Sequence, residues 1–426
     1  MRIALALVAI VGLTPSFLMA AEPIQINYDE AKMPKFTLPD PLVMEDGAKV
    51  TSAEQWKTDR RPEILRLFEE QVYGKAPPAP TKLVFEVFDD EPKALDGKAI
   101  RKQAKVQLTP DPEGPWMDVL LYLPPDATGP VPTFLTLNFY GNHTVHTDPG
   151  IKLSESWMRN NNEKGTKDHE ATEASRGTSA SRWPVEDIVK RGYGLACIYY
   201  GDIDPDFHDK FQNGVHPYFY EEGQTQPKPD QWASIAAWAW GLSRGLDYLE
   251  QEAKVDAGKV IVMGHSRLGK TSLWAGATDE RFAAAISNNS GCGGAALSRR
   301  RIGESVRRIN TSFPHWFCEN FNQYNDNEDE CPVDQHQLVS LIAPRPALVC
   351  SAVDDKWADP KGEFLAAKHA SPVYDLLGVE GLKTDTMPEP DEPVLSRLGY
   401  VIRPGGHGVL ASDWQRYMDF ADQHVK

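Results

Sequence analysis

A serine in the middle of the chain has the surroundings that an activated nucleophile needs. Ser266 stands in the string Gly264-His-Ser-Arg-Leu-Gly269, between an apolar segment typical of a strand and a segment typical of a helix. A sharp turn there exposes the serine Oγ at the carboxyl end of a sheet, and the amino end of the following helix stabilises negative charge. A serine that only caps the helix is the alternative interpretation. We expect Ser266 to attack an ester carbonyl.

A histidine near the carboxyl end could serve as the base for this serine. His407 lies in the string Arg403-Pro-Gly-Gly-His-Gly408, directly after the last segment expected to be a strand. An imidazole can accept the serine proton and later return it to the leaving alcohol. The order serine, acid, histidine along the chain is that of the α/β-hydrolases. His265 and His315 lack this placement, although either could line the same site.

The third member of such a triad is a carboxylate, and two neighbouring residues could supply it. Asp354 and Asp355 follow an apolar strand pattern in Ser351-Ala-Val-Asp-Asp-Lys-Trp357. An acid after this strand is the general arrangement of the fold, whereas two aspartates in a loop could also be simple caps. The residues alone leave this choice open.

The strings around the serine resemble those of one esterase family. Gly264-His-Ser-Arg-Leu-Gly-Lys270 is similar to the G-x-S-R-x-G-K signature of the glucuronoyl esterases, carbohydrate esterase family 15, of the bacterial type. Ser287 to Gly294 continues the likeness with S-N-x-S-G-x-G-G. In the usual hydrolase motif the second glycine comes one position earlier, where this chain has Leu268.

The resemblance implies a serine esterase that cleaves the ester between 4-O-methyl-glucuronic acid branches of xylan and alcohols of lignin. Glucuronoxylan and lignin-carbohydrate esters are then the expected partners. The reaction would be acyl transfer in two steps, with no metal or organic cofactor. An acetyl or feruloyl xylan esterase with the same triad is a second hypothesis. A non-catalytic carbohydrate-binding protein on the same scaffold is a third.

The resemblance also gives roles to four further residues. The backbone N–H of Arg267 is expected at the oxyanion, and in the family the arginine side chain reaches it too; such donors contribute about 3 kcal/mol each. Lys270, one helical turn beyond Ser266, is expected to donate to sugar hydroxyls. Glu304 and Trp357 match residues that hold the uronate ring. Because five arginines lie near Glu304 in the sequence, a structural ion pair is the alternative for that carboxylate.

The acid departs from the family's usual pattern. Related esterases often carry glutamate within S-N-E-S-G, whereas this chain has Asn289 at that position. An amide cannot supply the negative charge that stabilises an imidazolium. Some bacterial relatives place the acid after the next strand instead, and by register with them we expect Asp355 rather than Asp354.

These residues require a sheet whose strands end at one edge. Apolar, β-branched segments alternate with helical ones, which predicts an α/β fold with a mostly parallel sheet between two layers of helices. We expect strands near 82–88, 117–123, 132–138, 193–200, 258–263, 282–288, 345–352 and 398–403, and helices over 53–72, 231–252 and 268–277. Long loop insertions are expected near 142–182, 202–230 and 298–335. Residues 21–426 would form one catalytic domain with an N-terminal wrap.

Composition and charge limit the partners and the location that we expect for the protein. The formal net charge of −16 argues against nucleic acid or an anionic membrane surface as a partner. Residues 1–20 place Arg2 before a short apolar run and end in small residues, as in a cleavable signal peptide. We therefore expect a secreted or periplasmic monomer with no membrane anchor after cleavage. Cys318 and Cys331 are close enough in sequence to pair, but five cysteines leave at least one unpaired within the chain.

Overall fold

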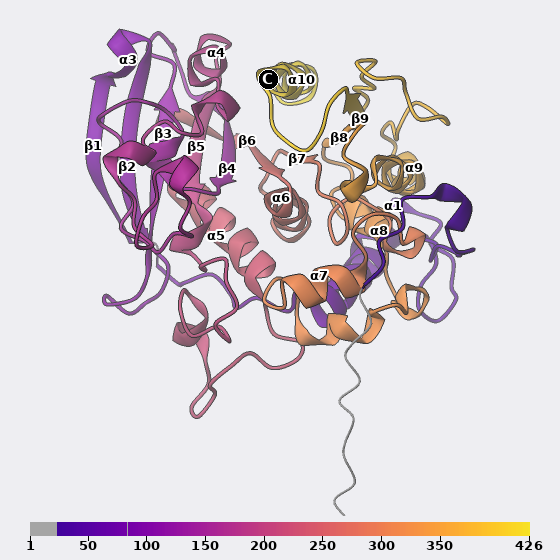
Figure 1. The fold of residues 1–426 in the computed structure, drawn as a ribbon. Helices are drawn as coiled ribbons and strands as arrows, with labels where there is room; N and C mark the ends of the chain where they lie inside the picture. Colours follow the sequence, from indigo (N-terminus) through magenta and orange to yellow (C-terminus); the bar gives the residue numbers. More distant parts are fainter. Residues whose placement is uncertain (1–23, 83) are drawn as a thin grey trace, which may run out of the picture.

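The computed structural model describes residues 24–82 and 84–426, which fold around a nine-stranded sheet (Figure 1). The signal peptide expected over 1–20 lies outside the described residues. The strand order is β1-β2-β3-β5-β4-β6-β7-β8-β9. Strands β4 to β9 run parallel to one another, whereas β1, β2 and β3 are antiparallel to their neighbours. Their bounds are β1 Phe85–Lys93, β2 Ala99–Gln107, β3 Trp116–Leu123, β4 Val131–Asn138, β5 Gly194–Tyr199, β6 Val255–His265, β7 Ala284–Asn288, β8 Ala347–Ala352 and β9 Leu398–Arg403.

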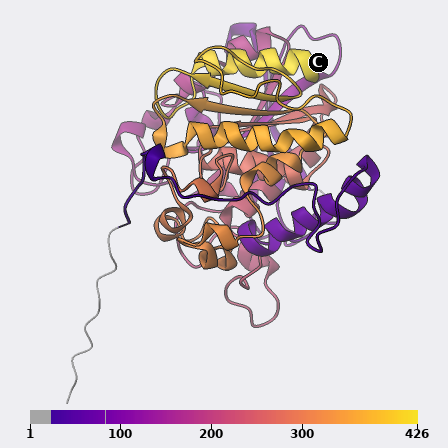
Figure 2. The same cartoon turned by 90° about the vertical axis from the view of Figure 1, so that its right-hand side faces the viewer.

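Helices cover both faces of the sheet and bury two separate apolar cores (Figures 1 and 2). One face carries α5 Ser234–Leu249, α6 Arg267–Thr278, α8 Gln335–Ser340 and α9 Pro360–Leu376. The other face carries α4 Val185–Lys190 and α10 Ala411–His424. Successive residues of β6 point to opposite cores, as Ile261 and Val262 do. The expected three-layer α/β-hydrolase architecture is confirmed.

Strand β2 was not among the expected strands, and its composition explains why. Its sequence AIRKQAKVQ mixes charged residues with small apolar ones, yet most of its residues are buried. Arg101 pairs with Asp89 of β1 and with Asp148, and Lys102 pairs with Glu252. Because tertiary ion pairs satisfy these charges, a strand forms where the local pattern did not indicate one.

The segment before the sheet is helical, as expected for 53–72. It contains α1 Ala53–Gln55 and α2 Arg61–Phe68, joined and followed by π-helical turns at Trp56–Arg60 and Glu69–Tyr73. Gly74 ends it with φ at 82°, where a Cβ would lie 2.1 Å from the Gln231 carbonyl oxygen. The wrap therefore packs directly against the chain that leads into α5.

The three segments expected as insertions hold little regular structure. Residues 142–182 and 202–230 contain only short 3-10 turns, and 298–335 adds α7 Val306–Ser312. A further short helix, α3 Ala94–Gly97, joins β1 to β2. Among the described residues, no helix combines the length and the apolar character needed to cross a bilayer.

Candidate active site

Ser266 lies in a strained turn between β6 and α6. Its backbone has φ 58° and ψ −129°, a left-handed conformation that is unfavourable for residues with a side chain. A Cβ on Gly264 would lie 1.9 Å from the Leu268 carbonyl oxygen. Only glycine therefore allows the helix to return this closely over the end of the strand.

The displaced second glycine has a packing reason. A Cβ on Gly269 would approach Ser290 Cβ to 3.1 Å and the carbonyl oxygens of Asn288 and Gly264 to 3.2 Å. Leu268, at the position of the usual glycine, is buried in the core. The close contact of α6 with the loop after β7 therefore falls at Gly269, one residue later than the second glycine of the usual motif.

His407 and Asp355 are in direct contact. His407 Nδ1 lies 2.7 Å from Asp355 Oδ2, a distance at which the ring N–H donates to the carboxylate. The histidine side chain is 43% exposed and the aspartate side chain 3%. Asp354 is exposed, and its backbone N–H donates to Gly405. Of the two neighbouring aspartates, the structure brings Asp355 to the histidine.

Asn289 forms part of the same contact. Its Nδ2 donates to Asp355 Oδ2 at 2.8 Å, while its Oδ1 is buried without a partner among the described residues. The residue follows β7 with φ at 48°. Where related esterases often carry glutamate, this chain therefore has an amide that donates a hydrogen bond to Asp355, the acid that follows the next strand.

All seven predicted site residues line one cavity of about 310 Å³. They come from the ends of β6, β8 and β9 and from the insertion before α7, so the parallel strands bring them to one edge of the sheet. The predicted residues are Ser266, Arg267, Lys270, Glu304, Asp355, Trp357 and His407. Their catalytic and binding roles remain predictions.

Arg267 is held by a buried aspartate and by aromatic rings. Its Nη1 donates to Asp206 Oδ2 at 2.9 Å, and its guanidinium carbon lies 4.7 Å from the centroid of the Trp316 ring. Phe139 and Phe313 flank the guanidinium at 5.3 and 5.9 Å. Because Asp206 is buried, this pair is not a surface salt bridge.

Asp206 accepts hydrogen bonds from three further side chains. His315 Nε2 lies 2.9 Å and Trp316 Nε1 2.8 Å from Oδ1, and the Tyr200 hydroxyl donates to Oδ2 at 2.9 Å. Burial alone would raise the pKa of Asp206, but the His315 hydrogen bond and the Arg267 charge hold it below its usual value. An ionised Asp206 therefore fixes the arginine.

Lys270, Glu304 and Trp357, which line the same cavity, form a second group of contacts. Lys270 Nζ lies 3.4 Å from Glu304 Oε2 and also donates to the Ser290 carbonyl, and the Glu304 N–H donates to the Trp357 carbonyl at 3.0 Å. Four nearby arginines pair with other carboxylates: Arg299, Arg300, Arg301 and Arg307. The ion pair of Glu304 is therefore with Lys270, inside the cavity.

Sequence reasoning missed Asp206, the role of Asn289 as a donor, and the buried Glu363 beneath the acid. No motif marks Asp206 or Glu363, and the S-N-x-S-G string that holds Asn289 does not reveal its role as a donor, since each of the three acts through contacts with residues distant in the chain. The two histidines named as possible lining residues do not line this cavity. His315 binds Asp206, and the His265 ring lies tilted against the His407 ring with the centroids 4.5 Å apart. Burial, and then the charge of His407, lower the pKa of His265, so that ring is neutral.

Metal chemistry was not expected here. Across residues 24–82 and 84–426, no group of three or more His, Cys, Asp or Glu side chains is placed to hold a metal ion.

Known proteins with similar sequences are esterases. Residues 218–378 match a family model described as glucuronyl esterase, fungi. Carbohydrate esterase MZ0003, from an unknown prokaryotic organism, is 57% identical over 97% of this chain and 95% of its own length. The 4-O-methyl-glucuronoyl methylesterase of Schizophyllum commune is 28% identical over 80% of this chain and 74% of its own.

Solved structures agree with this. A promiscuous CE15 esterase from a marine bacterial metagenome superposes with a TM-score of 0.88 at 57% identity, covering 94% of this chain and 100% of its own. The glucuronoyl esterase from Solibacter usitatus gives a TM-score of 0.88 at 50% identity, covering 93% and 100%.

Proposed function

This chain belongs to carbohydrate esterase family 15, the glucuronoyl esterases, and from that premise we propose that it hydrolyses esters of 4-O-methyl-glucuronic acid branches of xylan. The alcohol released would be one of lignin. One observation carries the proposal: a single cavity joins the serine, histidine and aspartate with a buried lysine, a buried glutamate and a half-buried tryptophan, which are suited to a hydroxylated acid.

The proposed reaction proceeds through an acyl-enzyme. Ser266 Oγ attacks the ester carbonyl while His407 takes its proton, and the imidazolium is stabilised by Asp355. The carbon–oxygen bond to the alcohol then breaks, and His407 gives that proton to the leaving oxygen. Water, deprotonated by His407, attacks the acyl-enzyme and releases the uronic acid and free Ser266.

Arg267 is the proposed source of charge for the tetrahedral intermediates. Its backbone N–H follows the nucleophile, and its side chain lines the same cavity with Nε unpartnered among the described residues. Donors already fixed in place stabilise a developing oxyanion without reorganisation. The rigid setting of the arginine, between aromatic rings and against Asp206, supports this role.

The test compares benzyl glucuronate with a simple acetate ester, using Ser266→Ala as the blank. We expect the glucuronate ester to be preferred, with Glu304→Gln lowering the ratio of glucuronate to acetate hydrolysis by about tenfold, since a hydrogen bond to a charged group is lost. A preference for acetate would contradict the proposal.

A second candidate, an acetyl or feruloyl xylan esterase, is favoured by one comparison, since the metagenomic neighbour is described as promiscuous. Broad acetate hydrolysis that does not respond to Glu304→Gln would support it. A fluorophosphonate probe that fails to label Ser266 would favour the non-catalytic carbohydrate-binding protein. We also propose that the protein acts in the periplasm or outside the cell, which the pattern of residues 1–20 supports. We further propose that it acts as a monomer.

A further inference from the structure

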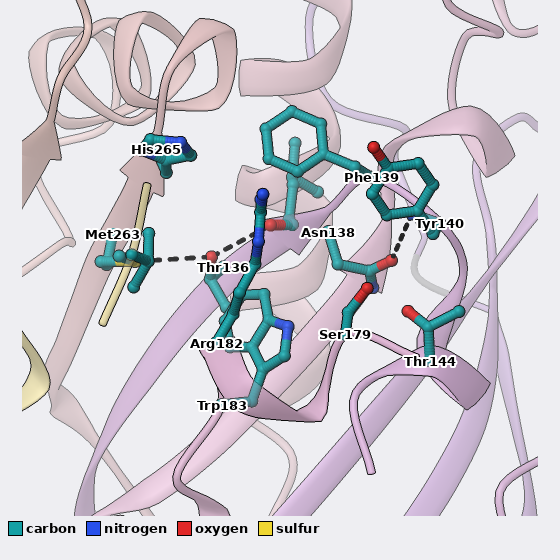
Figure 3. A pocket seen from close by; sticks show the side chains of 12 residues that line it. Thr136, Asn138, Phe139, Tyr140, Thr144, Ser179, Arg182, Trp183, Met263 and His265 are labelled. Carbon is teal, nitrogen blue, oxygen red and sulfur yellow. Dashed lines mark hydrogen bonds between the residues drawn. The ribbon is translucent and has the colours of Figure 1, made fainter. Parts of the chain in front are cut away.

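Two cations of the insertion 142–182 lie on aromatic rings beside the active site. The Arg182 guanidinium carbon is 6.0 Å from the Phe139 ring centroid, and Lys164 Nζ is 5.4 Å from that of Tyr140. Both rings follow β4 and are only partly buried. Figure 3 shows the Arg182 side chain extending toward Phe139. The small cavity drawn there has a volume of about 10 Å³, room for one water molecule, so a larger ligand would lie on its rim.

These two cations lack carboxylate partners. Of the other cations of this insertion, Lys152 pairs with Asp118 and Arg176 with Glu173, whereas Arg159 and Lys167 have no ion-pair partner among the described residues. Within the described part of the chain, no carboxylate lies within ion-pair distance of Lys164 or Arg182. Lys164 Nζ donates to a backbone carbonyl, that of Thr178.

The charges of the pair reinforce each other. Burial, and then the positive charge of Arg182, lower the pKa of Lys164, while Glu163 acts in the opposite direction. In a chain of net charge −16, this is a local excess of positive charge at the rim of a substrate cavity. A site of this kind attracts an anion even when the whole molecule repels it.

The position of the pair identifies which part of the substrate it would meet. The Phe139 ring also lies 5.3 Å from the guanidinium carbon of Arg267, so one ring separates Arg182 from a residue that lines the active-site cavity. In the sheet, β4 and the residues after it are on one side of β6, which carries Ser266, and β7 and β8 are on the other. Trp357 follows β8. The two cations are thus on the side of the nucleophile away from the wall proposed to hold the uronate.

We propose that Lys164 and Arg182 form a subsite for a carboxylate on the alcohol part of the ester. The inference rests on the proposed function, because it requires the uronate to occupy the opposite wall. A guanidinium pairs with a carboxylate through two parallel hydrogen bonds, and an ammonium adds a point charge. Phe139 and Tyr140 are only partly buried, so their rings can contact the body of an aromatic alcohol beside the two cations. The enzyme then selects acidic aromatic alcohols over neutral ones.

The experiment compares three glucuronate esters whose alcohols carry a neutral, a negative or a positive para group: benzyl, 4-carboxybenzyl and 4-(trimethylammoniomethyl)benzyl. At low ionic strength we expect kcat/KM for the carboxybenzyl ester to exceed that for the benzyl ester by about fivefold, and the excess to shrink in high salt. The cationic ester should be the poorest. Without the subsite, the net charge of the protein would give the reverse order.

The double variant Lys164→Gln/Arg182→Gln should bring the carboxybenzyl to benzyl ratio to one or below. Each ratio is measured within one protein, so differences in leaving-group reactivity cancel between variants. Lys190→Gln is the matched control, because Lys190 is an exposed cation that ends α4 and precedes β5, at the opposite edge of the sheet. Its ratio should equal that of the wild type.

Two results would overturn the inference: a wild-type ratio of one at low salt, or a ratio that the double variant leaves unchanged. The wild-type ratio and its salt dependence test the idea even if the double variant folds poorly. A protein that cleaves benzyl glucuronate without charge preference retains the proposed function and lacks the subsite. A protein that cleaves none of the three esters contradicts the proposed function itself.

Discussion

Asp355 receives two hydrogen bonds at one carboxylate oxygen, from His407 and from Asn289. A glutamate in place of Asn289 would bring a second carboxylate to this contact, and two such close acids share a proton rather than both ionising. The amide instead donates a hydrogen bond to the Asp355 carboxylate. The exchange of glutamate for asparagine is therefore consistent with an acid supplied by the neighbouring strand.

Replacing Asp355 by asparagine should nearly abolish turnover. The amide can hold His407 in the wrong tautomer and supplies no charge to the imidazolium, so we expect kcat on benzyl glucuronate to fall by about 10³- to 10⁴-fold. Steady-state kinetics at neutral pH measure this. Asp354→Asn is the control, because Asp354 is exposed, and it should retain near wild-type activity. Comparable activity in the two variants would remove Asp355 from the triad.

Glu363 of α9 joins the loops that carry Asn289 and Asp355. Its Oε1 accepts from the N–H groups of Ser290 and Gly291, and its Oε2 lies 2.5 Å from the Ser351 hydroxyl on β8. Burial raises the pKa of Glu363 to about 8. The folded protein therefore keeps a proton on this carboxyl at neutral pH, which the unfolded chain releases.

This proton makes stability depend on pH in a defined direction. Between the ordinary value of 4.5 and about 8, the unfolded chain binds fewer protons at this group than the folded one, so the free energy of unfolding falls as pH rises. The slope contributed is at most about 1.4 kcal/mol per pH unit. Glu363→Gln mimics the protonated acid, so this variant should lack the slope that Glu363 contributes.

The measurement is the melting temperature of wild type minus that of Glu363→Gln at several values between pH 5 and pH 8. We expect this difference to decrease steadily as pH rises. Glu54→Gln, at an exposed glutamate, should show no such trend. A constant difference for Glu363→Gln would mean that Glu363 is ionised in the folded protein across the range.

At the scale of elements, the insertion 202–230 contributes Asp206, which fixes Arg267. Asp206 lies 61 positions before Arg267 in the sequence. It accepts hydrogen bonds from His315 and Trp316 of the insertion 298–335. The insertion 202–230, which precedes α6 in the sequence, and the insertion 298–335, which follows it, therefore meet at the Asp206 carboxylate. In the fold they hold the Arg267 guanidinium at the cavity that Ser266 also lines.

Asp206→Asn should lower kcat more than it raises KM. The arginine would remain in its aromatic setting but lose its charged partner, and misplacing one oxyanion donor costs about 10- to 100-fold in turnover. Separate kcat and KM values on benzyl glucuronate distinguish this from a loss of ground-state binding. Asp209→Asn, in the same insertion, is the control. If only thermal stability falls in Asp206→Asn, the aspartate is structural.

The elements also show how far sequence reasoning reaches. The strand, turn and helix around Ser266, and the glycine-rich loop of His407, are local patterns, so the sequence predicted them and eight of the strands. Strand β2 and Asp206 depend on ion pairs and hydrogen bonds to partners far along the chain, and no local pattern indicates them. The choice of Asp355 over Asp354 needed register with relatives, since both have the same neighbours.

At the scale of the whole molecule, the N-terminal wrap reaches the wall proposed to hold the sugar. The Gly303 N–H donates to the Asn27 carbonyl at 2.8 Å, directly before Glu304. Arg300 pairs with Glu30 and, at 2.7 Å, with Asp359. The start of the described chain and the insertion 298–335 therefore support one another.

The five cysteines give a prediction for the molecule as a whole. In the structure all five are free and buried, including Cys318 and Cys331, which were close enough in sequence to pair. Burial raises the pKa of each of these two thiols to about 12, so neither forms the reactive thiolate at ordinary pH. A protein exported into an oxidising compartment would then keep its thiols because the fold protects them.

Thiol titration tests this protection on protein purified without reductant. Native protein should react with less than one equivalent of a thiol reagent at pH 8, and denatured protein with five, as the sequence contains five cysteines. Reductant should leave the melting temperature unchanged, since no disulfide constrains the unfolded chain. Three thiols after denaturation, rising to five with reductant, would show that one pair has been oxidised. Peptide mapping would then decide whether Cys318 and Cys331 form it.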